Sequence, residues 1–165
     1  MSRSKTQADA TPELSLIDVG VDEFAVVTGD GILMAHLRGS VAICLYDAVL
    51  EPGALLHLRA LPSSKGHTDL TDVVLSADLL LLEQTFEKVR AAAPRAQYWQ
   101  AKILAHCPSD DANQAAVASA VAKFAAEWLR ESNVTVVELQ TLGGQRARVQ
   151  FRPQMGQLRI ATVPA

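Results

Sequence analysis

The sequence predicts an α+β fold in which a β-rich core of layered, mixed sheets is flanked by two main amphipathic helices. Three observations support this prediction: β-rich runs fill the first third of the chain, two later stretches have helical spacing, and three β-rich runs follow the second stretch. The regular strand–helix alternation of a doubly wound parallel sheet is absent from the pattern. The 165 residues, 49% of them hydrophobic, suffice for one packed domain.

The expected strands of the first part are short runs separated by glycine and proline. They cover residues 14–19, 24–28, 32–37, 41–46 and 54–61. The run 41–46 is apolar throughout, which indicates a strand that is covered on both faces. Residues 1–12 are polar, so we expect a flexible leader there, followed by a single domain over 13–165.

Two amphipathic helices are expected, over residues 76–93 and 111–131. Apolar residues recur at helical spacing in both: Leu79, Leu82, Phe86 and Val89 in the first, and Val117, Val121, Phe124 and Trp128 in the second. Pro94 ends the first of these runs. The remaining expected strands lie between and after the helices, at 98–104, 134–139, 146–152 and 158–163.

Charge and hydropathy limit the classes of partner. The 15 lysines and arginines against 18 aspartates and glutamates give a net charge of −3, which argues against a nucleic-acid-binding surface. Apolar runs such as 41–46 and Leu79–Leu82 are far shorter than the roughly 20 residues that span a bilayer, and the polar N-terminus lacks the apolar segment of a secretory signal. Two cysteines make no disulfide framework. We therefore expect a cytoplasmic protein that neither binds nucleic acid nor inserts into a membrane.

Ser40 and His57 are the first candidates for chemistry. Gly39 before a small hydroxyl residue permits a sharp turn, which exposes backbone N–H groups beside a nucleophile. His57 is a polar residue in an apolar strand, as expected for a base that serves a site. The alternative, which spacing alone favours, is a structural histidine and a loop serine. A simple hairpin of 41–46 and 54–61 would leave the two about three residue pairs apart, so a turn at Gly39 or a bulge must bring them together.

Three other polar segments have simpler explanations. Residues 106–111 hold a histidine, a cysteine and two aspartates, for which we favour helix capping over metal binding. Residues 67–72 fit a solvated loop. Residues 142–148, with two glycines before an Arg-x-Arg pair, leave two interpretations open: anion binding through backbone N–H groups, or a turn that feeds an edge strand. We expect neither a metal nor a cofactor.

Several segments match one family in the same order along the chain. They are IDVGV at 17–21, FAVV at 24–27, VAICLYD at 41–47, GALLHL at 53–58, the acidic stretch 69–74, AKI at 101–103, GGQRAR at 143–148 and GQLR at 156–159. With these motifs the chain resembles the CheD family, the chemoreceptor glutamine deamidases of bacterial and archaeal chemotaxis, from about residue 14 to the C-terminus. The resemblance implies a CheD-like fold, chemoreceptor cytoplasmic helices as substrate, and a CheC-type phosphatase as a further partner.

The resemblance also implies which residues form the site. The family's catalytic cysteine directly precedes the VAICLYD-like segment, seventeen residues before its histidine, so these positions here are Ser40 and His57. The third catalytic residue, a threonine six residues before the nucleophile, falls on Met34. Gly39, Met34 and Val41 are the expected lining of the site and its oxyanion pocket.

These departures from the family predict impaired chemistry. In the family, a cysteine thiolate attacks the carboxamide of a glutamine, the histidine protonates the leaving ammonia, and water hydrolyses the thioester. A serine hydroxyl cannot be stored as an anion beside an imidazolium and needs a well-oriented base, and Met34 offers an imidazole only a weak acceptor. We therefore expect weak deamidation. The alternative is a non-catalytic homologue that binds chemoreceptor helices or a CheC-type phosphatase.

Two origins fit the serine at position 40: natural divergence, or replacement of a native cysteine. The family's glycines after the AKI strand fall on Ala105 and His106, and together with Met34 these independent departures favour natural divergence. A groove beside Ser40 that is open, rather than filled by Met34 and His36, would favour retained binding of a substrate side chain.

Overall fold

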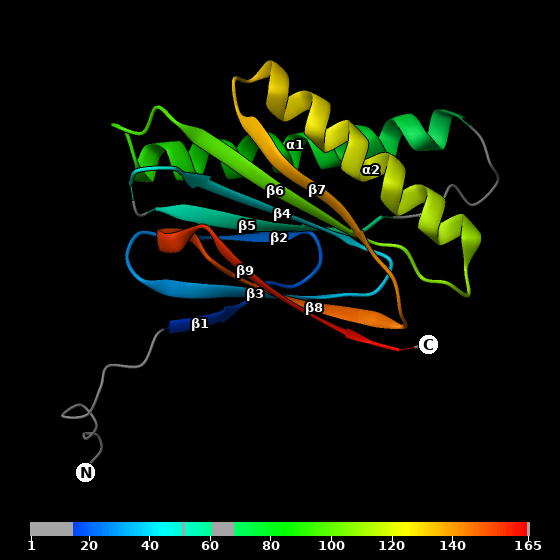
Figure 1. Ribbon diagram of the computed structural model, residues 1–165. Coiled ribbons are helices and arrows are strands. Elements are labelled where there is room, and N and C mark those ends of the chain that lie inside the picture. The colour runs from blue at the N-terminus through cyan, green and yellow to red at the C-terminus, as the bar shows by residue number, and fades with distance from the viewer. Residues whose placement is uncertain (1–14, 51, 61–67, 165) are drawn as a thin grey trace, which may run out of the picture.

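The computed structural model describes residues 15–50, 52–60 and 68–164, which form three layers (Figure 1). Within these residues, two helices cover one face of a five-stranded sheet, and a four-stranded sheet packs against its other face. The α+β prediction of layered sheets with two main helices is therefore confirmed. The expected leader at 1–12 and the expected loop at 62–67 lie outside the described residues. No helix among the described residues is long and apolar enough to cross a membrane.

The chain passes from one sheet to the other several times along the described elements. They are β1 (Ser15–Asp18), β2 (Glu23–Val27), β3 (Gly31–Leu37), β4 (Val41–Asp47), β5 (Gly53–Leu58), α1 (Thr68–Ala92), β6 (Trp99–His106), α2 (Ala112–Glu131), β7 (Thr135–Leu142), β8 (Arg146–Arg152), a 3-10 turn η2 (Pro153–Met155) and β9 (Gln157–Val163). The five-stranded sheet has the order β2-β5-β4-β6-β7 and the four-stranded sheet the order β1-β3-β8-β9. Both sheets are mixed, because β1–β3 and β6–β7 are parallel pairs among antiparallel ones.

The first helix is longer than the sequence pattern predicts. It begins at Thr68 instead of Ser76, so the acidic stretch 69–74 is helical and the expected loop at 67–72 is wrong from Thr68 on. Leu70 and Val74 are four residues apart and continue the helical spacing of apolar residues into this stretch, a signal that the prediction overlooked.

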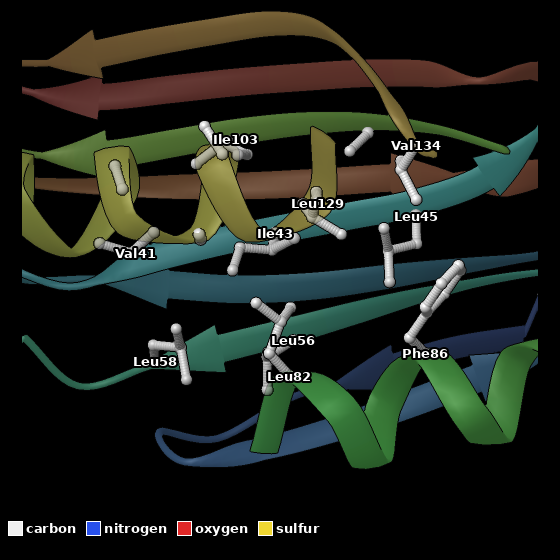
Figure 2. Packing of buried hydrophobic residues seen from close by; sticks show 14 of the residues in the cluster. Val41, Ile43, Leu45, Leu56, Leu58, Leu82, Phe86, Ile103, Leu129 and Val134 are labelled. Atoms are coloured by element: carbon white, nitrogen blue, oxygen red, sulfur yellow. The ribbon is translucent and has the colours of Figure 1, made fainter. Parts of the chain in front are cut away.

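Two buried hydrophobic clusters of described residues hold the layers together. One lies between the helices and the five-stranded sheet, where Leu82, Phe86 and Leu129 point from the helices toward Ile43 and Leu56 (Figure 2). The other fills the space between the sheets. The residues of β4 alternate between the two clusters, and every one of them is buried, as expected for a strand covered on both faces.

Two short connections carry the described chain from one sheet to the other, side by side at one end of the molecule. Residues 38–40 join β3 to β4, and residues 143–145 join β7 to β8. His106, the last residue of β6, contacts both: its Nδ1 accepts the Gly39 N–H at 2.7 Å, and its Nε2 lies 3.1 Å from the Gly144 carbonyl oxygen. Gly39 has a φ of +67° and Gly144 of +82°, a region that favours glycine.

Candidate functional site

Ser40 and His57 lie in hydrogen-bond contact. Ser40 Oγ is 2.8 Å from His57 Nε2, although seventeen residues separate them in the sequence. Each residue is only 3% exposed. The fold thus brings together the two residues that we place at the catalytic positions.

The register of β4 and β5 explains this contact. Ala42 of β4 pairs with His57, and Ser40, which directly precedes β4, lies two residues before that partner. An offset of two puts both side chains on the same face of the sheet, as diagonal neighbours within reach of an aromatic ring. The predicted offset of about three pairs is therefore wrong, and an offset of three would have placed the two side chains on opposite faces.

A backbone carbonyl holds the other nitrogen of His57. His57 Nδ1 is 3.1 Å from the carbonyl oxygen of Val19, and because a carbonyl can only accept, Nδ1 carries the ring proton. Nε2 is then free to accept the Ser40 hydroxyl proton. The Val19 N–H donates to the Met34 carbonyl at 2.7 Å, which fixes Val19 in place. This is the arrangement of a hydroxyl nucleophile and a general base, with a carbonyl where serine hydrolases have a carboxylate.

Burial determines the charge of the His57 ring. It lowers the pKa of His57 below the ordinary value of 6.5, while the Val19 carbonyl and the nearby Asp22 and Asp18 oppose part of that shift. At neutral pH the ring is therefore uncharged. An uncharged ring can take a proton from Ser40, as a general base must.

The side chain of Met34 lies away from the Ser40–His57 pair. Its neighbours Leu33 and Ala35 point into the cluster between the sheets, so Met34 points to the outer face of the four-stranded sheet. There Gln150 Nε2 lies 3.8 Å from the Met34 sulfur. Met34 therefore supports the base through its carbonyl, by way of Val19, instead of lining the site with its side chain as we expect from the family position.

Neither Gly39 nor Val41 lines the site as we expect from the resemblance. The side chain of Val41 is buried in the cluster under the helices. The Gly39 N–H, an expected oxyanion donor, is already donated to His106. On the other side of the turn, Gln114 Nε2 donates to the carbonyls of Gly39 and Ala60, and a Cβ at position 39 would come within 2.5 Å of Gln114 Cγ. The turn before Ser40 is thus clamped between a histidine and a glutamine.

Sequence reasoning missed both members of this clamp. Segment 106–111 is interpreted above only as a metal site or as caps, and the capping interpretation is confirmed for Asp111, whose side chain accepts the Gln114 N–H at 3.0 Å. His106 is fully buried, and its backbone N–H also donates to the Ser40 carbonyl at 2.9 Å. The sequence offered one signal for His106: the family resemblance implies a glycine at this position, and this chain has a histidine there. Among the described residues, no cluster of three or more His, Cys, Asp or Glu side chains is placed to hold a metal.

The structure rules out one of the two interpretations of segment 142–148, the turn that feeds an edge strand. Strand β8 lies between β3 and β9, so the edge-strand interpretation is wrong. The Gln145 N–H donates to the Val163 carbonyl at 2.6 Å, and the Gly144 carbonyl contacts His106, so this backbone is used within the fold. Arg146 and Arg148 alternate with buried Ala147 and point to the outer face of the sheet.

The Ser40–His57 pair is closed in this structure. Both residues are buried, and neither lines any of four surface cavities formed by described residues. One of these, a groove of about 640 Å³, includes His36, Leu37 and Arg38, which directly precede the Gly39 turn. A substrate side chain therefore needs a local opening to reach Ser40.

Comparison with known proteins points to the same family as the motifs. No family model matches the chain. The chain is 26% identical over 147 residues to the chemoreceptor glutamine deamidase CheD of Thermotoga maritima. The aligned residues cover 88% of this chain and 90% of that protein. It is 28% identical over 155 residues to the probable chemoreceptor glutamine deamidase CheD of Syntrophomonas wolfei subsp. wolfei, over 90% of this chain and 94% of that protein. The resemblance to the CheD family is confirmed, and the chain is CheD-like along almost its whole length.

Proposed function

We propose that this CheD-like chain binds the cytoplasmic helices of chemoreceptors and deamidates a glutamine side chain with Ser40 and His57, more slowly than a cysteine at position 40 would. The observation that carries the proposal is the 2.8 Å contact between Ser40 Oγ and His57 Nε2. The two relatives described above are named chemoreceptor glutamine deamidases, which supports the choice of a glutamine as substrate.

The proposed reaction uses the hydroxyl of Ser40 as nucleophile. As Oγ attacks the carboxamide carbon, the proton of the hydroxyl passes to His57 Nε2, and the imidazolium then gives it to the departing ammonia. Water, activated by the same ring, hydrolyses the acyl-serine ester and leaves a glutamate. The Val19 carbonyl keeps the ring in the required tautomer and orientation throughout.

Three features of the site support a slow reaction. A serine hydroxyl is far less acidic than a thiol, so little nucleophile is present before attack. The neutral carbonyl of Val19 stabilises the imidazolium less than a carboxylate would. The Gly39 N–H is engaged by His106 and does not serve as a free donor to the oxyanion.

The proposal is tested by mass spectrometry of a chemoreceptor cytoplasmic fragment after incubation with the protein. Deamidation adds about 1 Da per glutamine. We expect a slow gain with the chain as it stands, a gain at least roughly tenfold faster with Ser40→Cys, and background with Ser40→Ala and His57→Gln. Because Cys44 is fully buried in β4, it cannot replace the introduced thiol. Failure of the Ser40→Cys protein to form any glutamate would contradict the enzymatic proposal.

A non-catalytic role is the second candidate, and the burial of the pair favours it. With both residues 3% exposed, the fold can present a CheD-like surface without admitting a carboxamide. In that case the protein and its Ser40→Cys variant retain the chemoreceptor fragment or a CheC-type phosphatase in a pull-down, and neither forms glutamate. Absence of both associations would contradict this candidate.

A further inference from the structure

The outer face of the four-stranded sheet carries a basic groove. Strand pairing places His36 of β3 opposite Arg148 of β8, while the adjacent Leu37 and Ala147 face the buried cluster. The groove encloses about 640 Å³ and is lined by His36, Leu37, Arg38, Arg146, Ala147, Arg148, Ala161 and Val163. Both helices lie beyond the other sheet, so neither covers this face (Figure 1).

The cations of this groove have no acidic partner in the described part of the chain. Its described lining holds three arginines and a histidine and no carboxylate. The ion pairs formed among the described residues are Arg59–Asp22 and Arg152–Asp30, neither of which includes a lining residue. In a chain of net charge −3, Arg146 and Arg148 of β8 and Arg38, which directly follows β3, are a local concentration of positive charge, and a bound anion would relieve their mutual repulsion.

The groove is continuous with the turn that holds Ser40. The side chain of Arg38 lines the groove, while its backbone N–H lies 3.3 Å from Ser40 Oγ. Arg146 follows the connection 143–145, which His106 ties to Gly39. A polypeptide that presents a side chain to Ser40 therefore extends over the groove with its neighbouring residues.

We propose that this groove binds acidic side chains of the helix that carries the target glutamine, one to two turns from it. The inference rests on the proposed function, because it assumes that the glutamine reaches Ser40. Helical residues one turn apart are separated by about 5.4 Å along the axis, and Arg38, which directly precedes the Gly39–Ser40 turn, already lines the groove, so acidic residues close to the glutamine in the helix are the ones that would meet it. The guanidinium groups of Arg146 and Arg148 present paired donors that fit carboxylates.

The binding experiment uses two fluorescently labelled helical peptides with one glutamine each. In the first, glutamates stand four and seven residues from the glutamine on both sides; in the second, serines replace them. By anisotropy we expect the protein to bind the acidic peptide roughly tenfold more tightly than the serine peptide at low salt, with the difference falling at high salt. We expect the double variant Arg146→Gln/Arg148→Gln to bind the acidic peptide about fivefold more weakly than the unchanged protein does. Arg130→Gln, an exposed change at the end of α2, leaves it unchanged.

A second measurement separates this inference from the proposed function. Both peptides are incubated with the Ser40→Cys protein, with and without the two arginine substitutions, and the glutamate formed is measured. No glutamate from either peptide contradicts the proposed function, while charge-selective binding in the first experiment would still support the groove. Equal binding and equal deamidation of both peptides overturn the groove and leave the proposed function standing.

A third measurement tests whether the groove binds an anionic membrane surface instead, with vesicles of phosphatidylserine and phosphatidylcholine. We expect the two arginine substitutions to change vesicle binding less than binding of the acidic peptide. If vesicles bind through the same arginines and the two peptides bind alike, the groove recognises a membrane surface and the inference is wrong.

Discussion

Of the histidines that the structure describes, His57 and His106 are buried on either side of the Ser40 turn, with opposite proton arrangements. His57 donates from Nδ1 to the Val19 carbonyl and accepts at Nε2. His106 accepts the Gly39 N–H at Nδ1 and donates from Nε2 to the Gly144 carbonyl. One ring is therefore placed to accept the proton of Ser40, and the other holds the backbone before it.

We expect the substitution of His106 by alanine to destabilise the folded protein strongly. His106→Ala leaves the buried Gly39 N–H and the partly buried Gly144 carbonyl without their partner and opens a cavity, so we expect the free energy of unfolding to fall by about 2–4 kcal/mol. The measurement is urea denaturation, with His36→Ala as the control on the exposed face. The control should change stability by less than about 0.5 kcal/mol. Equal, small effects of the two substitutions would show that His106 does not support the turn.

At the scale of elements, β4 is fixed at both of its ends. At the end distant from Ser40, the Asp47 carboxylate accepts backbone N–H groups of Val49 and Leu50 with one oxygen and of Gln97 and Tyr98 with the other. Burial alone would raise the pKa of Asp47, but these four donors outweigh it and lower the pKa. One carboxylate thus joins the β4–β5 connection to the start of β6.

Helix α1 contains a buried carboxyl group at Asp78 that lacks a full set of hydrogen bonds among the described residues. Burial, and secondarily the charge of Asp22, raise the pKa of Asp78 to about 6. Asp78 Oδ2 has no hydrogen-bond partner among the described residues. Above that pKa the folded protein must hold a buried charge, which costs free energy.

Asp78→Asn is therefore expected to stabilise the protein at pH 7.5 by about 1–2 kcal/mol. Because the folded-state pKa lies above the unfolded value of 3.8, the penalty that the substitution removes is full above about pH 6 and shrinks as the pH falls toward 3.8. Thermal unfolding of both proteins at pH 7.5 and pH 4.5 measures this. A gain of the same size at both values would show that the charge of Asp78 is not the cause.

At the scale of the whole molecule, the layered fold could be predicted because it depends on local patterns. The Ser40–His57 pair could be predicted only through the resemblance of the ordered motifs to one family, since spacing alone favours a structural histidine and a loop serine. The apolar run of β4, the helical spacing before Pro94, and the ordered motifs each have a signature in the sequence. The register that puts Ser40 and His57 on one face has no such signature, because it depends on how two strands align.

Other parts of the site arise only from tertiary structure. The partner of His57 Nδ1 is a backbone carbonyl, which any residue at position 19 could supply, so no side-chain pattern reveals it. The basic groove joins Arg38, which directly follows β3, with Arg146 and Arg148 of β8, and their proximity follows from the pairing of β3 with β8 across more than a hundred residues. The interior position of β8 likewise follows from the C-terminal strand that covers its edge.

The account depends on a neutral His57 ring that accepts the Ser40 proton at Nε2. Nitrogen-15 NMR of histidine-labelled protein measures this directly, with His106 as an internal reference of opposite tautomer. We predict that at pH 7.5 His57 is protonated at Nδ1 and bare at Nε2, that it titrates below 6.5, and that His106 carries its proton on Nε2. A His57 ring that is charged at pH 7.5, or protonated at Nε2, would contradict the account, because neither form can accept a proton from Ser40.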